Sequence, residues 1–336
     1  MQGASKHPLA PGSGIATPIP GRRVPSPAHL DRINSLNIGL MVGSAALACT
    51  LPFEVFLASY AVLGPLHYLT QISWLHDRGF FSTGRRDWIP LLLLALLALD
   101  GTYTHWIPWN GATFTAFGAG IAAAFIRNPV AKVAALIVCA AFAAPVMRWY
   151  PARAFFGTLL ATVVHVYVFT GLFILAGSMK SRSRSGYASF AVYLACGIGL
   201  LVVQPPSSYQ PGTYALANLE PFDGLIRTIG RLVPGGGERP ALVAIGRFLG
   251  FAYTYHYLNW FSKTGIIRWH EVSRARMAAI GALWLASVTL YAWDYATGLA
   301  VLFLLSVSHV FLEFPLDART LVEVVTGMRR PARAAS

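Results

Sequence analysis

The sequence predicts an all-α protein, a polytopic integral membrane helix bundle of about ten transmembrane helices. Hydrophobic residues make up 55% of the 336 residues and charged residues only 12%, about half of what a soluble domain carries. The apolar residues form uninterrupted blocks, such as 89–99 and 299–308, several of which approach the roughly 20 residues that cross a bilayer. This composition excludes a soluble enzyme, a disordered protein and a disulfide scaffold.

Ten apolar segments follow one another along the chain, and Pro52, Pro129 and Pro151 lie at boundaries between them. Proline cannot continue a helix without the loss of a hydrogen bond, so these positions are typical of turns between spans. The expected transmembrane helices cover residues 35–50, 53–76, 88–105, 111–127, 130–148, 154–177, 187–204, 241–262, 277–295 and 298–315.

The rest of the chain divides into two tails and one long connection. Residues 1–32, rich in Pro, Gly, Ser and basic residues, predict a flexible basic cytoplasmic tail and no signal peptide. Residues 33–316 form the expected transmembrane bundle. Its long outer loop, 205–240, contains LEPFDGLIRTIGRLV, which has the spacing of a short amphipathic helix at the interface. Residues 317–336 predict an amphipathic, basic cytoplasmic tail.

The charge is strongly positive, with 26 Lys and Arg against 13 Asp and Glu. In a soluble chain this balance would suggest a nucleic-acid partner, but here the excess lies in short loops, where it sets topology and faces anionic lipid. The alternation of basic and less basic loops predicts that both termini are cytoplasmic. We therefore expect a multi-pass protein of the bacterial inner membrane, with the lipid bilayer as partner and no nucleic acid.

Histidines gather at one depth of the expected bundle. Spans two, six, eight and ten, which all run from outside to inside, carry His67, His165, His256 and His309. At about 1.5 Å per residue, each lies roughly 9–18 Å from the cytoplasmic end of its helix. A lone membrane histidine is more often a hydrogen-bonded packing residue, but four at one depth favour a metal site, because imidazole is the commonest metal ligand.

The tenth span adds a carboxylate to this set. Glu313 follows His309 by four residues, so both side chains share one helix face and can reach the same ion or each other. A protonated carboxyl near the interface is the alternative for Glu313, and Asp317 is expected at the interface. On the outer side, away from the site, the sequence places Asp100 and His105.

The second span offers further polar residues. Gln71 shares the face of His67, and Tyr68 is its neighbour in the chain. His76 lies nine residues after His67, which is half a turn out of phase on a straight helix. We therefore expect His76 to be a rim ligand or a contact to a lipid headgroup, with Gln71 and Tyr68 behind the inner ligands.

The eighth span carries a polar and aromatic stripe that includes Tyr253, Asn259 and Lys263 at helical spacing with His256. An interfacial belt of aromatic and basic residues explains Lys263 well, but His256 with Asn259 poorly. On the connector that follows, His270 and Glu271 either fold back as ligand and carboxylate or are exposed loop residues.

These segments carry two resemblances. LPFEVFLASYAVLGPLHYLTQISWLHDR, AYTYHYLNWFSKTGIIRWH and SHVFLEFPLD resemble a family of bacterial multi-pass membrane proteins, which implies the membrane fold and no particular activity. In chemistry alone, the histidines resemble those of membrane di-iron enzymes such as fatty-acid desaturases, hydroxylases and bacterial carotene-cleaving dioxygenases. The clustered HxxxH and HxxHH motifs of the desaturase-type families are absent from this sequence, so the ligand set and the number of metal ions stay open.

Three functions are compatible with these observations. The first is a membrane metal-dependent oxidoreductase, such as an oxygenase, hydroxylase or desaturase, with iron, possible di-iron, or else zinc or copper; it would use a hydrophobic small-molecule substrate and an electron donor. The second is a proton-coupled transporter, to which Arg247, Asp100 and Glu313 would contribute. The third is an electron-transfer subunit with haem b between histidine pairs. We expect the first, because the ionisable residues concentrate on one side.

Overall fold

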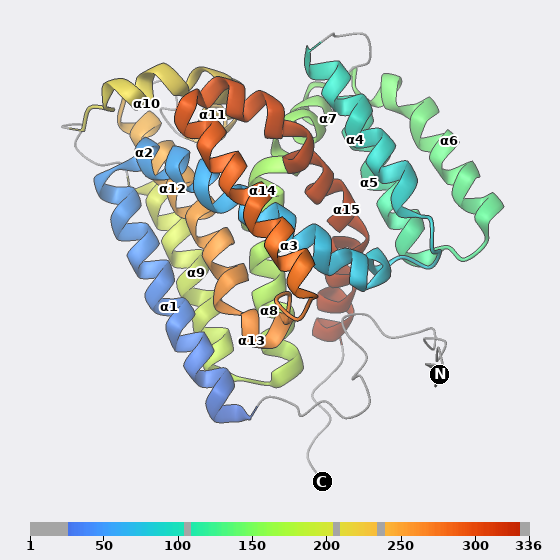
Figure 1. Cartoon of the computed structure of the whole chain (residues 1–336), viewed down its shortest axis with the longest axis horizontal. Helices are drawn as coiled ribbons and strands as arrows, with labels where there is room; N and C mark the ends of the chain where they lie inside the picture. Colours follow the sequence, from blue (N-terminus) through green and yellow to red (C-terminus); the bar gives the residue numbers. More distant parts are fainter. Residues whose placement is uncertain (1–25, 104–108, 204–208, 234–238, 330–336) are drawn as a thin grey trace.

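The computed structural model describes residues 26–103, 109–203, 209–233 and 239–329, and within these ranges the chain is helical, with no strand (Figure 1). The long helices are α1 (Pro27–Thr50), α3 (Gly64–Asp77), α4 (Trp88–Tyr103), α5 (Trp109–Phe125), α6 (Pro129–Val146), α8 (Thr170–Ser181), α9 (Arg184–Val202), α12 (Arg239–Ser262), α14 (Arg274–Trp293) and α15 (Tyr295–Arg329). The short ones are α2 (Pro52–Ala58), α7 (Tyr150–Ala154), α10 (Thr213–Asn218), α11 (Asp223–Gly230) and α13 (Thr264–Ile267).

Two stretches are wider π-helices and two are 3₁₀ turns. The π-helix η1 (Ser59–Leu63) joins α2 to α3, and the π-helix η3 (Phe155–Phe169) joins α7 to α8. The 3₁₀ turns are η2 (Gly79–Phe81) and η4 (Glu220–Phe222). Because η1 and η3 continue directly into their neighbours, residues 52–77 and 150–181 each form one long helical segment.

Seven helical segments in the described ranges are long and apolar enough to cross a membrane: Pro27–Thr50, Pro52–Asp77, Pro129–Val146, Tyr150–Ser181, Arg184–Val202, Arg274–Trp293 and Tyr295–Met328. Two shorter apolar helices lie at Trp88–Ala98 and Gly111–Phe125. These findings confirm an all-helical protein with membrane-spanning character. The helix α12 is 24 residues long but is not among the seven, and the total of about ten spans stays a prediction.

The helices form two groups around a central layer (Figure 1). Helices α4, α5 and α6 pack against one another on one side, and α1, α9 and α12 do so on the other. Between them run α3, the η3–α8 segment and the long α15, which contacts α3, α4, α5, α8 and α14. The four histidines of the expected site therefore belong to three central segments and to α12.

Two glycines of α12 let it approach α2 closely. A Cβ at Gly246 would lie 2.7 Å from the ring of Phe53, and one at Gly250 would lie 2.8 Å from the carbonyl oxygen of Pro52. The two glycines are four residues apart on one face, a spacing with which membrane helices approach closely. This contact fixes the position of α12, and with it that of His256.

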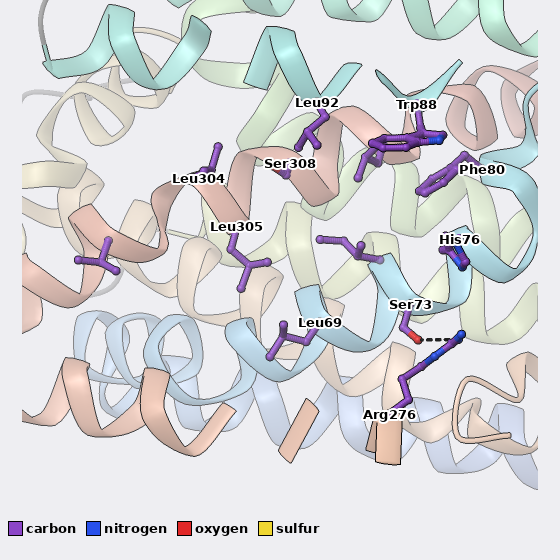
Figure 2. Close-up of a pocket in the computed structure, with 13 residues that line it drawn as sticks. Leu69, Ser73, His76, Phe80, Trp88, Leu92, Arg276, Leu304, Leu305 and Ser308 are labelled. Carbon is purple, nitrogen blue, oxygen red and sulfur yellow. Dashed lines mark hydrogen bonds between the residues drawn. The ribbon is translucent and has the colours of Figure 1, made fainter. Parts of the chain in front are cut away.

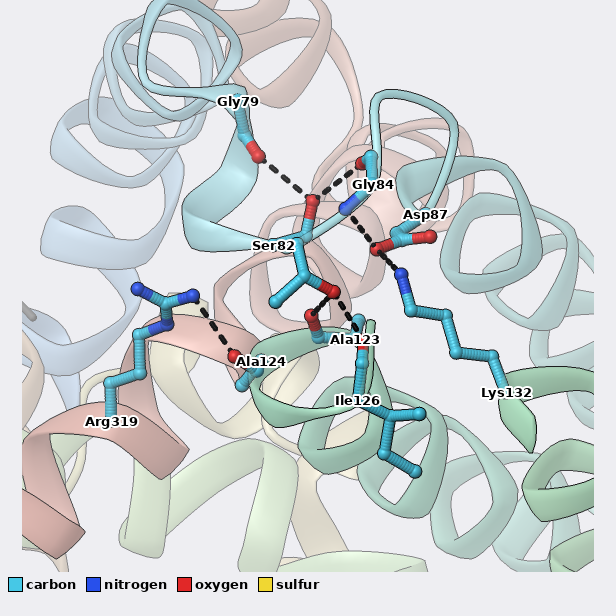
Figure 3. A network of polar contacts seen from close by, with 10 residues as sticks. Gly79, Ser82, Gly84, Asp87, Ala123, Ala124, Ile126, Lys132 and Arg319 are labelled. Carbon is cyan, nitrogen blue, oxygen red and sulfur yellow. Dashed lines mark hydrogen bonds and ion pairs between the residues drawn. The ribbon is translucent and has the colours of Figure 1, made fainter. Parts of the chain in front are cut away.

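Polar contacts tie the C-terminal half of α15 to the group α4–α6 (Figure 3). Arg319 donates from Nη2 to the carbonyl oxygen of Ala124 at 2.9 Å, one of the last carbonyls of α5, which have no partner within their own helix. Asp87 accepts from the backbone N–H of Gly84 at 2.8 Å and from Lys132 Nζ at 2.5 Å. The first bond connects α15 to α5, and the Lys132–Asp87 contact connects α6 to the turn before α4.

The structure corrects the expected boundaries at both ends. Helix α1 begins at Pro27, because Ser26 caps it by accepting a hydrogen bond from the His29 N–H, so residues 27–32 are not part of a flexible tail. Helix α15 continues through Pro315 to Arg329, so 317–329 is not a separate segment. Residues 310–318 are buried among neighbouring helices, and this packing outweighs the one backbone hydrogen bond that proline removes.

The connection 205–240 is not a structureless loop. It contains α10, η4 and α11 in its described part, and α11 coincides with the amphipathic helix that the sequence predicts. Leu225, Ile226 and Ile229 are buried on one side of α11, whereas Asp223 and Arg227 form an ion pair on its exposed side.

We predict opposite effects for alanine at two helical glycines. Alanine favours a helix over glycine by about 0.5–1 kcal/mol, so Gly281→Ala, where a Cβ meets no atom within 4 Å, should raise the thermal unfolding temperature in detergent or leave it unchanged. Gly250→Ala should lower it, because overpacking costs about 1–3 kcal/mol. A Gly250→Ala protein that is as stable as Gly281→Ala would contradict the close contact between α12 and α2.

Candidate functional site

Four imidazole rings meet at the centre of the bundle. His67 comes from α3, His165 from η3, His256 from α12 and His309 from α15, and their exposed fractions range from 1% for His67 to 8% for His256. The ring centroids of neighbouring members lie 4.7 to 5.6 Å apart. We call these four residues the histidine cluster.

The cluster consists of two close pairs that use the same ring atom. His67 Nε2 lies 3.1 Å from His256 Nε2, and His165 Nε2 lies 3.2 Å from His309 Nε2. All four Nε2 atoms therefore point toward the inside of the cluster. Within the described residues, no three His, Cys, Asp or Glu side chains form a ready-made metal-ligand group, so the arrangement is one of two pairs rather than one closed shell.

The Nδ1 atoms of the same rings point outward. His256 Nδ1 lies 2.7 Å from Thr170 Oγ1, within hydrogen-bond range. His165 Nδ1 lies 3.6 Å from Glu313 Oε2, which makes this carboxylate oxygen its acidic neighbour. The Nδ1 atoms of His67, His165 and His309 are buried, and no described residue forms a hydrogen bond with them. Since an unpaired buried polar atom costs about 1–3 kcal/mol, the cluster is an expensive arrangement for an apolar bundle.

Local backbone geometry explains why these rings converge. The π-helix η1 ends directly before α3, whose first turn contains Pro65, and His67 follows at once. His165 lies inside η3, where the wider turn changes the direction of successive side chains relative to an α-helix. Interruptions of this kind are frequent at functional sites. As a result, His67 and His165 point in directions that a continuous α-helix through the same residues would not give them.

Aromatic side chains enclose the cluster on two sides. Tyr68 stacks on His309, with centroids 4.1 Å apart and an interplanar angle of 23°, and its hydroxyl lies 2.9 Å from that of Tyr257. Trp260 packs edge-on against His67 and donates from Nε1 to Thr70 Oγ1 at 3.0 Å. These contacts leave the rings of His67 and His309 little freedom to rotate, and they cover this side of the cluster with aromatic surface.

An acidic side faces His165. Glu313 is buried, and Gln71 of α3 lies beside it as a hydrogen-bonding neighbour. Asp317, which we expected at the interface, is fully buried one turn after Glu313, and no described residue pairs with either of its carboxylate oxygens. The cause is the uninterrupted α15, which carries residue 317 back into the bundle.

The structure does not bring every expected residue to the cluster. The His76 side chain is 67% exposed and bonds to Asp77 at 3.2 Å, as its opposite phase on α3 requires. His270 and Glu271 are exposed on the connector between α13 and α14, where Glu271 pairs with Arg268. Arg268, at the end of α13, has a positive φ of 60°, and the chain changes direction there before it reaches His270.

Three further expected residues lie outside the histidine cluster, on or just after α12. Tyr253 packs against Phe56 with ring centroids 5.0 Å apart, and Asn259 accepts a hydrogen bond from the Tyr255 hydroxyl at 3.4 Å. Lys263 follows the end of α12 and is half-buried. The side chains of Asp100 and His105 lie outside the described residues.

Sequence reasoning missed Thr170 and Tyr257 as partners of the cluster. Thr170 lies five residues after His165, a separation that brings side chains together only in a π-helix, and no pattern in the sequence announces one. Tyr257 follows His256 directly, a position that points elsewhere on an α-helix, yet its ring packs against His67 with centroids 5.3 Å apart and its hydroxyl contacts that of Tyr68.

Comparisons with known protein families, curated proteins and solved structures found no match to this chain. The functional argument therefore rests on the geometry of the histidine cluster.

We predict that the Thr170 hydroxyl stabilises the fold through His256. Thr170→Val keeps the shape but leaves His256 Nδ1 without its partner, so the free energy of unfolding should fall by about 1–3 kcal/mol. Thr170→Ser keeps the hydroxyl and should lose clearly less. Thermal unfolding of both variants in the same detergent measures the difference, and equal losses would contradict a role for the hydroxyl.

Proposed function

We propose that the chain is an integral-membrane metal-dependent oxidoreductase that acts on a hydrophobic substrate, with one or two metal ions held by the histidine cluster. The observation that carries this proposal is the pair of Nε2···Nε2 contacts at 3.1 and 3.2 Å on four different helical segments. Imidazoles with a nearby carboxylate suit non-haem iron best, and also zinc or copper.

The distances within each pair fit shared coordination. Metal–nitrogen bonds of about 2.0–2.1 Å place two ligands of one ion about 2.9 Å apart at a right angle and about 3.3 Å apart at the tetrahedral angle. The observed separations of 3.1 and 3.2 Å fall between these values. Two pairs also accommodate a site of two ions, whose usual separation is about 3.5–4 Å.

The surroundings of the rings support the same proposal. Ligating histidines commonly donate their other N–H to a carboxylate or other acceptor, which fixes the tautomer. Thr170 stands behind His256 and Glu313 stands behind His165. Where both rings of a pair carry their proton on Nδ1, the two Nε2 lone pairs face one another and repel, and a cation between them removes the repulsion. An N–H···N hydrogen bond accounts for each pair alone, but not for the meeting of two pairs.

The chain's own residues would bind the metal ion, orient its ligands and shield it from water. The four imidazoles would bind the ion, and the Thr170 hydroxyl would hold the orientation of His256. The Glu313 carboxylate would face His165 as a negative charge, and Tyr68 and Trp260 would keep water out. A bound iron ion would supply one-electron and dioxygen chemistry, for which the protein provides the pocket and the electrostatics. This reaction class also requires an electron donor, which we place on the cytoplasmic side.

The two other functions fit the geometry less well. A haem with two axial histidines needs a flat macrocycle between facing helices, and rings 4.7 to 5.6 Å from their neighbours fill that space. A proton-coupled carrier needs a polar site that opens toward both faces, whereas His67, His165 and His309 are at most 3% exposed. No observation in the described residues favours either function over a metal site.

We predict that metal content depends on the cluster. Protein purified without a chelating tag or added metal should contain a transition metal by elemental mass spectrometry, with iron as the expected element. Replacement of His67, His165, His256 or His309 by Ala should lower the metal affinity by more than the roughly 10–100-fold typical of residues behind the ligands.

His76→Ala is the matched control, because it removes a histidine from the same helix as His67 at an exposed position. It should keep the metal of the wild type. A wild-type protein that binds no transition metal, or cluster variants that retain it in full, would overturn the proposal. A Soret band in the visible spectrum would instead support haem.

We further propose that the protein lies in a bacterial inner membrane with both termini cytoplasmic, as the basic loops suggest. In a chain whose three cysteines are replaced by alanine, Tyr214→Cys on α10 should react with a membrane-impermeant reagent added to intact cells. Arg182→Cys, between α8 and α9, should react only after lysis. The reverse pattern would contradict this orientation.

A further inference from the structure

A groove runs along the bundle on the side of α3 that faces away from His67. It lies between α3, α4, α14 and α15, and its volume is about 690 Å³, within the usual range of small-molecule sites. Leu69 and Ile72 of α3 and Leu304 and Leu312 of α15 line it. It is distinct from the histidine cluster, because its residues on α3 occupy the opposite helix face.

The groove is apolar along its length and polar at one end (Figure 2). Figure 2 shows Ser73, His76 and Arg276 gathered at one side, and Leu69, Leu304 and Leu305 toward the other. This gradient matches an amphiphile that inserts a hydrocarbon chain and keeps a charged headgroup at the end where α3 finishes and α14 begins.

Arg276 has hydrogen-bonding capacity left for such a headgroup. It donates from Nη1 to the two Asp77 oxygens at 2.8 and 2.6 Å and to Ser73 Oγ at 3.4 Å. Because these bonds all use Nη1, no described residue accepts from the Nε and Nη2 hydrogens of the same guanidinium, which can donate to a further acceptor. The next basic residue, Arg274, is exposed at the same end, so positive charge exceeds the single carboxylate of Asp77.

The turn at the polar end of the groove has a strained backbone. Phe80 and Phe81 have positive φ values of 54° and 53°, which bulky residues rarely adopt and which cost on the order of 1–3 kcal/mol each. Phe80 is buried and, with Trp88, lines the groove next to His76. The turn thus holds two aromatic rings at the level where a lipid headgroup meets its chains, as interfacial aromatic residues do.

We propose that this groove binds an anionic phospholipid, with one acyl chain along α15 and the phosphate at Arg276. The apolar length, the free guanidinium edge and the aromatic mouth each match one part of that molecule. The site lies at the end of the bundle that carries the basic turns after α3 and before α14, where anionic lipid is attracted. The proposal is independent of the function of the histidine cluster.

The test is lipid retention. The full chain is reconstituted in nanodiscs of equal parts phosphatidylglycerol and phosphatidylethanolamine, and the lipids that stay bound are counted by native mass spectrometry. The wild type should retain phosphatidylglycerol preferentially. Arg276→Gln should weaken that retention about tenfold, as expected for the loss of a hydrogen bond to a charged group, and Leu305→Trp should abolish it by filling the groove.

Two further variants make the result decisive. Asp77→Asn removes the carboxylate that competes for Arg276 and should strengthen phosphatidylglycerol retention, a gain that misfolding cannot produce. Leu285→Trp, at an exposed position of α14, should behave as the wild type. Equal retention of both lipids by the wild type, unchanged retention in Arg276→Gln and Leu305→Trp, or a matching loss in Leu285→Trp would overturn the proposal.

Discussion

The cost of burying polar side chains in an apolar bundle is the constraint on which the rest of this structure depends. Four imidazoles and the carboxyl groups of Glu313 and Asp317 are less than a tenth exposed, and several of their polar atoms have no partner. Such burial is expensive unless a hydrogen bond, an opposite charge or a metal compensates it. The metal that we propose between the paired Nε2 atoms would explain why this cost is concentrated at one place.

Contacts elsewhere in the bundle fix the positions of the helices that carry the histidine cluster. Gly246 and Gly250 set α12 against α2, Arg319 anchors α15 to the end of α5, and Tyr68 stacks on His309. Each contact fixes one of the segments that carry a ring. A site assembled from four segments keeps its geometry only if those segments cannot slide, so the fold and the cluster depend on the same packing.

The helical class and the four central histidines could be predicted from the sequence, because long apolar blocks and ionisable residues within them are local signals. The continuation of α15 through Pro315 could not, since it depends on packing from several helices around residues 310–318. For the same reason the sequence did not predict the burial of Asp317. The π-helix around His165 has no signal in the sequence, so the role of Thr170 was not predicted either. His76 was correctly set half a turn from His67, because helix phase requires only residue spacing.

The central claim is that the four inward Nε2 atoms bind metal, and anomalous diffraction from crystals grown without added metal tests it most directly. The account predicts an anomalous peak between the paired rings, about 2.0–2.1 Å from the Nε2 atoms of His67 and His256, of His165 and His309, or of both pairs. Paired rings in direct N–H···N contact with no anomalous peak between them would contradict it.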